Sequence, residues 1–174
     1  MKYFVDDYVI FDLETTGLEK DKDKIIEIGA LKYHNNELID EFSYLINPEC
    51  ELPEVIINIT GITNEDLKDK ETIDKILPKF IEFIGDLPLI AHNKDFDLGF
   101  IYENIKKLNL TRINNYSIDT LYLARKYFPN LYNHKLETIK KYFNVKQVSH
   151  RATGDCFTTN VLYQECKKKE LIKD

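Results

Sequence analysis

The spacing of apolar residues changes after the first quarter of the chain, and this change limits the folds that the chain can adopt. The segments 8–14, 25–33 and 37–46 have the composition and length of strands. Residues 34–36, His-Asn-Asn, form a hairpin-like junction between the second and the third segment. The first part of the chain is therefore predicted to be an antiparallel meander.

The rest of the chain alternates between helical and strand patterns. Short apolar strands are predicted at residues 87–91 and 116–118, and helices at residues 72–84, 95–108, 120–127, 134–143 and 151–169. Pro78 should kink the first helix or mark its true start, and Asp95 is the natural N-cap of the second. The sequence thus predicts an α/β fold with a mixed five-stranded sheet, in which a meander precedes the alternating elements and helices cover both faces.

Length and composition are those of one globular domain, which we expect to span residues 1–174. Apolar residues make up 43% of the 174 residues and charged residues 31%. No apolar run approaches the roughly 18 residues that span a bilayer. The acids Asp6 and Asp7 lie where a signal peptide has its apolar stretch. We therefore expect no membrane partner.

The cysteines and the net charge further limit the kinds of protein that this chain can be. Cys50, Cys156 and Cys166 are far apart and form no Cys-x-x-Cys pair, so they predict neither a disulfide framework nor a zinc site. We expect all three in or near the core of a cytoplasmic protein. A net charge of −6 disfavours a purely electrostatic nucleic-acid binder, but not an enzyme that holds nucleic acid through bound metal ions.

Two acids interrupt the first strand, among residues that otherwise favour burial. Asp12 and Glu14 are two positions apart, so their side chains point to the same face of a strand. Neighbouring carboxylates repel each other and resist burial unless something neutralises them, and a divalent cation is the usual partner. The alternative interpretation is a pair of strand-end acids that face water.

Two later segments carry similar residues. His92-Asn-Lys-Asp-Phe-Asp97 begins at a strand end and enters a helix, where sheet proteins often place binding residues. His150-Arg-Ala-Thr-Gly-Asp155 leads into the last helix, and a histidine near an aspartate can act as an acid–base pair. Each segment alone is also compatible with a helix cap or an exposed loop histidine.

In combination, these segments resemble the DEDDh 3'-5' exonucleases, the group of the epsilon subunit of bacterial DNA polymerase III and ribonuclease T. The three motifs are Phe11-Asp-Leu-Glu-Thr-Thr-Gly17, His92-Asn-Lys-Asp-Phe-Asp97 and His150-Arg-Ala-Thr-Gly-Asp155. Ile59-Thr-Gly-Ile-Thr63 and Ile118-Asp-Thr-Leu121 match two further family segments. The resemblance covers residues 8–166 and implies a ribonuclease-H-like fold.

The resemblance also implies a set of catalytic residues. Asp12, Glu14, Asp97 and Asp155 would bind two divalent ions, Mg²⁺ or Mn²⁺, and His150 would be the general base. The reaction would release nucleoside 5'-monophosphates from the 3' end of a nucleic acid. Cys156 stands where the family usually has alanine, and we expect this exchange of small residues to preserve activity.

A pocket for the terminal nucleotide follows from the same resemblance. The expected substrate-binding residues are Thr15, Thr16, Gly17, Leu18, Ile59, Thr60, His92, Asn93 and Phe96. Gly17 lets the backbone come close, and Leu18 can wedge against the last base. Phe96 has core packing as an alternative role, and Asn93 a role in a turn. Thr60 stands where some relatives have a histidine, which leaves the fine substrate preference open.

The charge distribution favours a nucleic-acid substrate. Residues 125–151 hold seven basic residues and one acid, a charge of +6, so the rest of the chain carries −12. Five aromatic residues are interleaved with the basic ones, as on surfaces that follow a phosphate backbone and stack bases. They are Tyr127, Phe128, Tyr132, Tyr142 and Phe143. The alternative interpretation is a solvated helix face above core aromatics.

Several functional alternatives stay open. We expect a 3'-5' exonuclease that acts on single-stranded 3' ends, with DNA preferred and RNA as the alternative. A nucleic-acid-binding module without catalysis is disfavoured, because all five expected catalytic residues are present. An accessory subunit that binds a DNA polymerase is the third possibility. The sequence decides neither the preferred metal nor the oligomeric state.

Overall fold

The computed structural model describes residues 4–146 and 151–172. Its five-stranded sheet consists of β1 (Tyr8–Thr15), β2 (Ile25–His34), β3 (Glu37–Leu45), β4 (Leu89–Ala91) and β5 (Ser117–Asp119). The strand order is β3-β2-β1-β4-β5. β1 pairs antiparallel with β2, and β2 with β3, whereas β4 is parallel to β1 and β5 to β4. The predicted mixed sheet with its initial meander is confirmed.

The helices follow the predicted order, with two additions. They are α1 (Glu54–Thr60), α2 (Asn64–Leu67), α3 (Ile73–Ile84), α4 (Lys94–Lys107), α5 (Thr120–Tyr127), α6 (Leu136–Tyr142) and α7 (Ala152–Leu171). α3 continues through Pro78, so this proline does not mark the helix start. The N-cap of α4 is Asn93 in the left-handed conformation, so the expectation for Asp95 was wrong.

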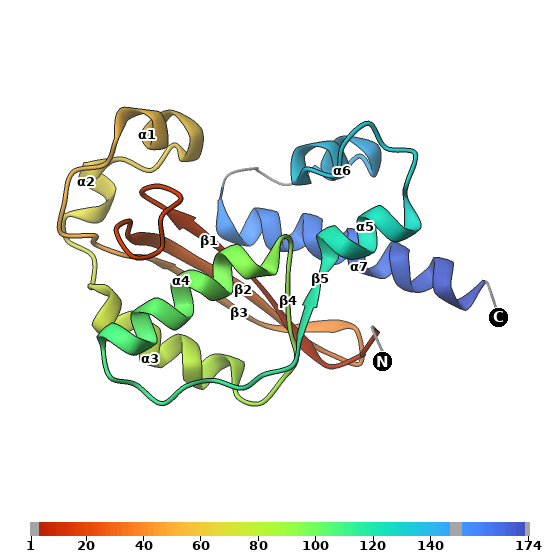
Figure 1. Cartoon of the computed structure of the whole chain (residues 1–174), viewed down its shortest axis with the longest axis horizontal. Helices are drawn as coiled ribbons and strands as arrows, with labels where there is room; N and C mark the ends of the chain where they lie inside the picture. Colours follow the sequence, from red (N-terminus) through yellow and green to blue (C-terminus); the bar gives the residue numbers. More distant parts are fainter. Residues whose placement is uncertain (1–3, 147–150, 173–174) are drawn as a thin grey trace.

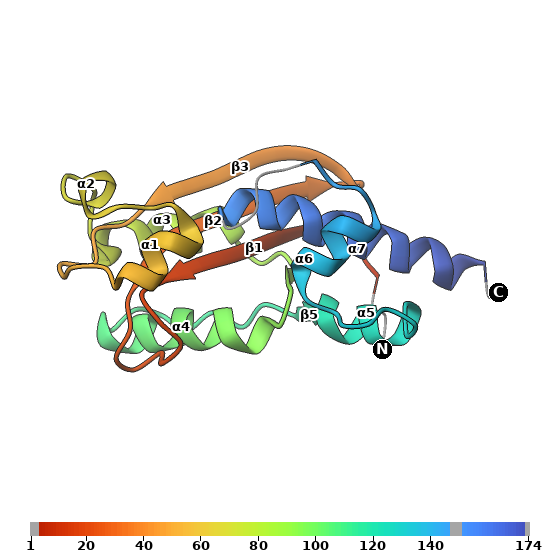
Figure 2. The ribbon, with the colours of Figure 1, turned by 90° about the horizontal axis from the view of Figure 1, so that it is seen from above.

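Helices cover both faces of the sheet, because the side chains of β1 alternate between two cores. Val9, Phe11 and Leu13 pack with α3 and α4 on one face. Tyr8 and Ile10 pack with α5 and α7 on the other face. In the view of Figure 1, α7 and α6 lie above the strands and α3 lies below them. Figure 2 shows β3, β2 and β1 one after another, with β3 at the outer edge.

The two unpredicted helices pack together above one end of the sheet (Figure 1). Leu52, Ile62 and Leu67 form a small core with Ile26 of β2, and partly buried residues of α1 pack against it. α2 is a single turn that Thr63 starts with a capping box, in which its hydroxyl accepts the amide of Asp66. α1 is rich in β-branched residues, which carry no helical signal, so its helix depends on this packing.

The three cysteines divide between the core and the surface. Cys156 and Cys166 are buried and free, as expected, whereas Cys50 is exposed, because it lies in the loop that leads to α1. Among the described residues, none of the helices combines the length and the apolar character that crossing a membrane requires.

Candidate active site

The candidate site begins with the two carboxylates of β1. Asp12 and Glu14 share a face of the strand with Tyr8 and Ile10, the face on which α7 packs. Both residues are partly buried. Phe11, which precedes Asp12, and Leu13, which lies between the two acids, are buried in the core on the opposite face. The alternation of the strand therefore directs both acids toward α7.

The first turn of α7 adds a third carboxylate. One oxygen each of Asp12, Glu14 and Asp155 lies within 4.8 Å of the other two. All three side chains are partly buried. A divalent cation fits this donor set, because Mg²⁺ and Mn²⁺ take carboxylate oxygens as ligands. The predicted juxtaposition of these three residues is present in the fold.

Asp97 enters beside β1 from the N-terminal part of α4. β1 pairs with β4 only at Val9 and Ile10, so the C-terminal half of β1 extends beyond β4. There the amide of Leu13 donates to Asp97 Oδ1 at 3.2 Å. Asp97 is only 3% exposed, and its charge acts on Asp12. The fourth predicted acid thus lies against the cluster, although it is not one of the three that lie within 4.8 Å of one another.

Burial and mutual repulsion raise the pKa values of these acids. Burial, followed by the charge of Asp97 and then Asp155, raises the pKa of Asp12 well above its ordinary range. Burial and the charge of Asp155 raise the pKa of Glu14 to about 8. Burial also raises the pKa of Asp97 to about 8, although hydrogen bonds from backbone amides counteract it. The clustered acids therefore bind a proton, or another positive charge, more tightly at neutral pH than isolated carboxylates would.

The predicted general base lies just before the third motif acid in sequence. His150 falls outside the described residues, which resume at Arg151. Its assignment stays a prediction.

The turn after β1 is held by its own hydrogen bonds. The Thr15 hydroxyl donates to the carbonyl of Gly17 at 2.6 Å, and the Thr16 hydroxyl accepts the amide of Lys24 at 2.9 Å. Asp23 accepts from the Thr16 hydroxyl at 3.3 Å. A Cβ atom at Gly17 would lie only 2.6 Å from an oxygen of Asp23, so a larger residue here would displace the Asp23 carboxylate. The predicted residues at this turn form a fixed structure next to Glu14.

The other predicted pocket residues divide into exposed and buried ones. Leu18 is 83% exposed and Ile59 is 49% exposed, which is unusual for large apolar side chains. Thr60 is buried, and its hydroxyl donates to the carbonyl of Ile56 at the end of α1. Leu18 and Ile59 are therefore available to a ligand, whereas Thr60 serves the local backbone.

The second motif has mainly structural contacts. The ring nitrogens of His92 lie 3.0 Å from Thr120 Oγ1 and 2.7 Å from the carbonyl oxygen of His134. Asn93 adopts φ 68° at the start of α4, which fits its alternative role in a turn. Phe96 is partly buried and stacks obliquely with Phe100 at 5.1 Å, which fits core packing. Whether these three residues also touch a substrate stays a prediction.

Comparison with known proteins decides the family. A family model described as "Exonuclease", of the ribonuclease T group, matches residues 9–163. The chain belongs to the exonuclease family. Curated relatives include the PolC-type DNA polymerases III of Bacillus cereus, 42% identical over 95% of the chain, and of Listeria monocytogenes, 43% identical over 96%. The chain spans 12% and 11% of the length of these relatives.

Solved structures agree with this exonuclease fold. Exonuclease X in complex with 5' overhanging duplex DNA matches with a TM-score of 0.74 and 24% identity, over 93% of this chain and 92% of that one. An Escherichia coli exonuclease I complex with single-stranded DNA matches with a TM-score of 0.85 and 17% identity, over 94% of this chain and 40% of that one.

The chain contains a fifth acid at the site that the motifs did not indicate. Glu27 of β2 is 1% exposed and pairs in register with Glu14 of β1. Arg151 donates to it, with Nη2 3.0 Å from Oε1. A signal was present in the sequence, because Glu27 is a lone acid in the apolar strand Ile25-Ile-Glu-Ile28. This is the same kind of signal that identified Asp12.

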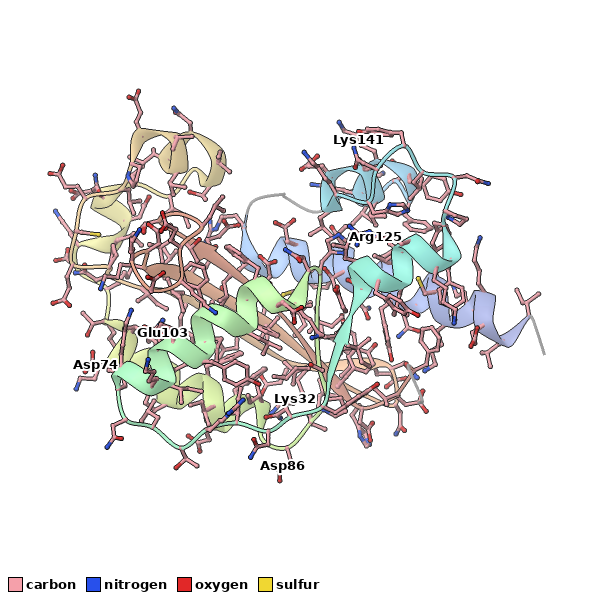
Figure 3. The ribbon with its side chains drawn as sticks, viewed as in Figure 1. Lys32, Asp74, Asp86, Glu103, Arg125 and Lys141 are labelled. Carbon is pink, nitrogen blue, oxygen red and sulfur yellow. The ribbon has the colours of Figure 1, made fainter. Side chains whose placement is uncertain are left out.

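The basic segment, residues 125–151, contributes side chains beside the second motif. Arg125 and Lys135 line a pocket together with His92 and Asn93. In Figure 3, Arg125 on α5 and Lys141 on α6 lie on the upper side of the molecule, whereas Asp74 and Asp86 lie on the lower side. Some aromatic residues of the segment fit the interpretation as core residues, and others fit the interpretation as an exposed binding surface. Tyr127 and Phe128 are core residues, whereas Tyr132 is 83% exposed and Tyr142 is 57% exposed.

Proposed function

We propose that this chain is a metal-dependent 3'-5' exonuclease that hydrolyses single-stranded DNA ends to nucleoside 5'-monophosphates. The observation that carries the proposal is the convergence of Asp12, Glu14 and Asp155 within 4.8 Å, with Asp97 against them. A fold that holds four partly or fully buried acids together without a cation bears a large electrostatic cost. Membership of the exonuclease family supplies the reaction class.

The acids would hold two divalent ions, Mg²⁺ or Mn²⁺. The charges of Asp97, Asp155 and Glu14 all act on Asp12, so Asp12 would be a ligand of the bound ions. When bound, a pair of such ions stabilises the attacking and the departing oxygen of an in-line phosphoryl displacement. The carboxylates bind and orient, and none of them has to act as a nucleophile.

His150 is proposed to take the proton from the attacking water. An imidazole with an ordinary pKa of about 6.5 can accept and return a proton near neutral pH. It precedes the first turn of α7, which carries Asp155. Replacement by alanine should therefore lower turnover and leave the acid cluster intact.

The terminal nucleotide is proposed to bind between the turn after β1 and the end of α1. Leu18 and Ile59 offer exposed apolar side chains for stacking against a base. Thr15, Thr16 and Gly17 would bring the backbone close to the sugar, and Thr60, His92, Asn93 and Phe96 would support the pocket walls. Upstream phosphates would follow the basic residues Arg125 and Lys135.

DNA is the preferred substrate in this proposal, and a DNA polymerase is the preferred partner. The PolC-type relatives are DNA polymerases, and the structures of exonucleases X and I are complexes with DNA. We infer a cytoplasmic proofreading or repair role from these relatives. An RNA-directed exonuclease is the less favoured alternative.

The test is degradation of 5'-labelled single-stranded DNA and RNA of one sequence, with Mg²⁺, Mn²⁺ or EDTA. We expect a metal-dependent ladder that shortens from the 3' end, with DNA degraded faster. Asp12→Ala should abolish it, whereas Glu71→Gln, which removes a charge from an exposed ion pair with Lys79, should not. Absence of degradation would refute the proposal, and preference for RNA would refute the choice of DNA.

A further inference from the structure

Glu27 is a buried charged residue beside the acid cluster that the proposed reaction does not use. Its side chain is 1% exposed, and its charge acts on both Asp12 and Glu14. A buried carboxylate beside other carboxylates is costly unless it has strong partners. The partners of Glu27 therefore indicate why the fold keeps it.

Both oxygens of Glu27 bind the start of α7. Arg151 Nη2 donates to Oε1 at 3.0 Å, and Arg151 Nε lies 3.2 Å from each oxygen. The backbone amide of Ala152 donates to Oε2 at 3.1 Å. The side chain thus forms a fork-like ion pair and a hydrogen bond to the helix backbone at the same time.

These contacts replace a cap that α7 lacks. The residue at its N-cap position is Arg151, whose side chain makes no capping hydrogen bond. The first amides of a helix have no partner within the helix, and its N-terminus favours negative charge. Glu27 supplies both the acceptor and the charge from the neighbouring strand.

A second contact on β2 fixes the same turn. A Cβ atom at Gly29 would lie 2.5 Å from the amide nitrogen of Thr153 and 2.6 Å from Ala152, so the helix rests directly on the strand backbone. The Cys156 thiol also donates to the carbonyl of Gly29 at 3.4 Å. Glu27 and Gly29 are two positions apart on β2 and therefore face α7 together.

The register of the sheet links this contact area to the acids. Glu27 pairs with Glu14, and Gly29 pairs with Asp12. The amide of Asp155 donates to the carbonyl of Arg151 at 3.1 Å, so Asp155 lies one turn beyond the contact with Glu27. A shift of the helix start would therefore move Asp155 relative to Asp12 and Glu14.

We propose that Glu27 is a positioning residue that, through Arg151 and the amide of Ala152, sets the start of α7 and thereby the place of Asp155 in the catalytic cluster. This inference rests on the proposed exonuclease function. Arg151 has a second effect, because its charge offsets that of Glu27 and partly counteracts the repulsion on Glu14.

The test uses Glu27→Gln. Glutamine removes the charge and replaces one of the two acceptor oxygens by an NH2 donor, so the fork to Arg151 and the acceptor for the Ala152 amide cannot both be kept in the present geometry. We expect kcat on single-stranded DNA to fall about 10–100-fold with KM nearly unchanged, the range found when residues that support metal ligands are removed. Hydrogen–deuterium exchange should become faster in residues 151–157 and stay unchanged at the far end of α7.

Two further variants make the test independent of the stability of Glu27→Gln. Arg151→Lys keeps the charge but loses the fork, so we expect an intermediate kcat. Arg151→Met should lower kcat at least as far as Glu27→Gln, because it also leaves the buried Glu27 carboxylate without its partner and removes the positive charge that acts on Glu14. Glu71→Gln, which breaks an exposed ion pair by the same chemical change, is the matched control and should leave kcat and exchange unchanged.

The outcomes separate this inference from the proposed function. Faster exchange at the start of α7 with an unchanged kcat would overturn the positioning role and leave only a structural one. Unchanged exchange in both Glu27→Gln and Arg151→Met would overturn the contact itself. If the unmodified chain degrades no nucleic acid, the proposed function fails, while the exchange measurement still decides whether Glu27 sets the helix start.

Discussion

In the absence of divalent ions, this protein should lose stability as the pH rises, because the acids of β1 must then ionise inside the fold. Burial and the charges of Asp155 and Glu27 raise the pKa of Glu14 from 4.5 to about 8. The folded state therefore binds this proton more tightly than the unfolded chain does. Its contribution to the free energy of unfolding is fully present below pH 4.5 and is lost as the pH rises to about 8.

The size of the effect follows from the same pKa values. The difference between 4.5 and about 8 corresponds to about 5 kcal/mol at full effect. Solvent reaches the partly exposed side chain of Glu14, and screening lowers the expected loss to about 2–3 kcal/mol. For a chain of this size, that loss corresponds to a decrease in Tm of about 5–10 °C.

The assay is urea unfolding between about pH 5 and about pH 8, with EDTA or with Mg²⁺, for the unmodified protein and for Glu14→Gln. The variant lacks the titrating group, so its stability should depend less on pH. The difference between the two proteins isolates Glu14, since other groups titrate in the same range. Mg²⁺ should restore stability to the unmodified protein at about pH 8 and have a smaller effect on the variant.

Two results would refute this reasoning. One is an identical pH dependence for Glu14→Gln and the unmodified protein, which would mean that Glu14 does not ionise against other charges. The other is a lack of stabilisation by Mg²⁺ or Mn²⁺ at about pH 8, which would mean that the acids do not form a cation site in the native state.

Four other perturbations have expected outcomes. Asp155→Asn should lower kcat by more than the roughly 100-fold typical of residues that only support a metal ligand, measured with labelled DNA. Gly29→Ala should cost about 1–3 kcal/mol in urea unfolding, because its Cβ atom meets the start of α7, and an unchanged stability would contradict this close approach. The contribution of His92 to the free energy of unfolding should decrease as the pH falls below 6.5, because burial lowers its pKa in the folded state; this trend opposes that of Glu14 and should be absent from His92→Gln in thermal melts. Leu18→Ala should change the free energy of unfolding by less than about 0.5 kcal/mol, since Leu18 is 83% exposed, but should raise KM for single-stranded DNA.

Most elements were predictable because their patterns are local. β1 ends one residue beyond its prediction, and α4 begins one residue before its own. α1 and α2 were missed for physical reasons. α1 lacks a helical apolar period and depends on packing against Leu52 and Ile62, and α2 is only one turn long. Pro78 does not mark the start of α3, because the packing of α3 against the sheet retains the helix on both sides of it, whereas a kink at Pro78 stays a prediction.

The sequence alone determined which acids belong together. Asp12 and Glu14 are conspicuous because a strand has a period of two and charges resist burial, and the resemblance to the exonuclease motifs added Asp97 and Asp155. Only the tertiary structure showed which residues from distant parts of the chain contact these acids. It placed Glu27 opposite Glu14 through strand register, and it brought Arg151 to Glu27 across 124 positions of the chain. The physical reason is that periodicity is read within one element, whereas the contacts of a buried charge depend on which elements pack against it.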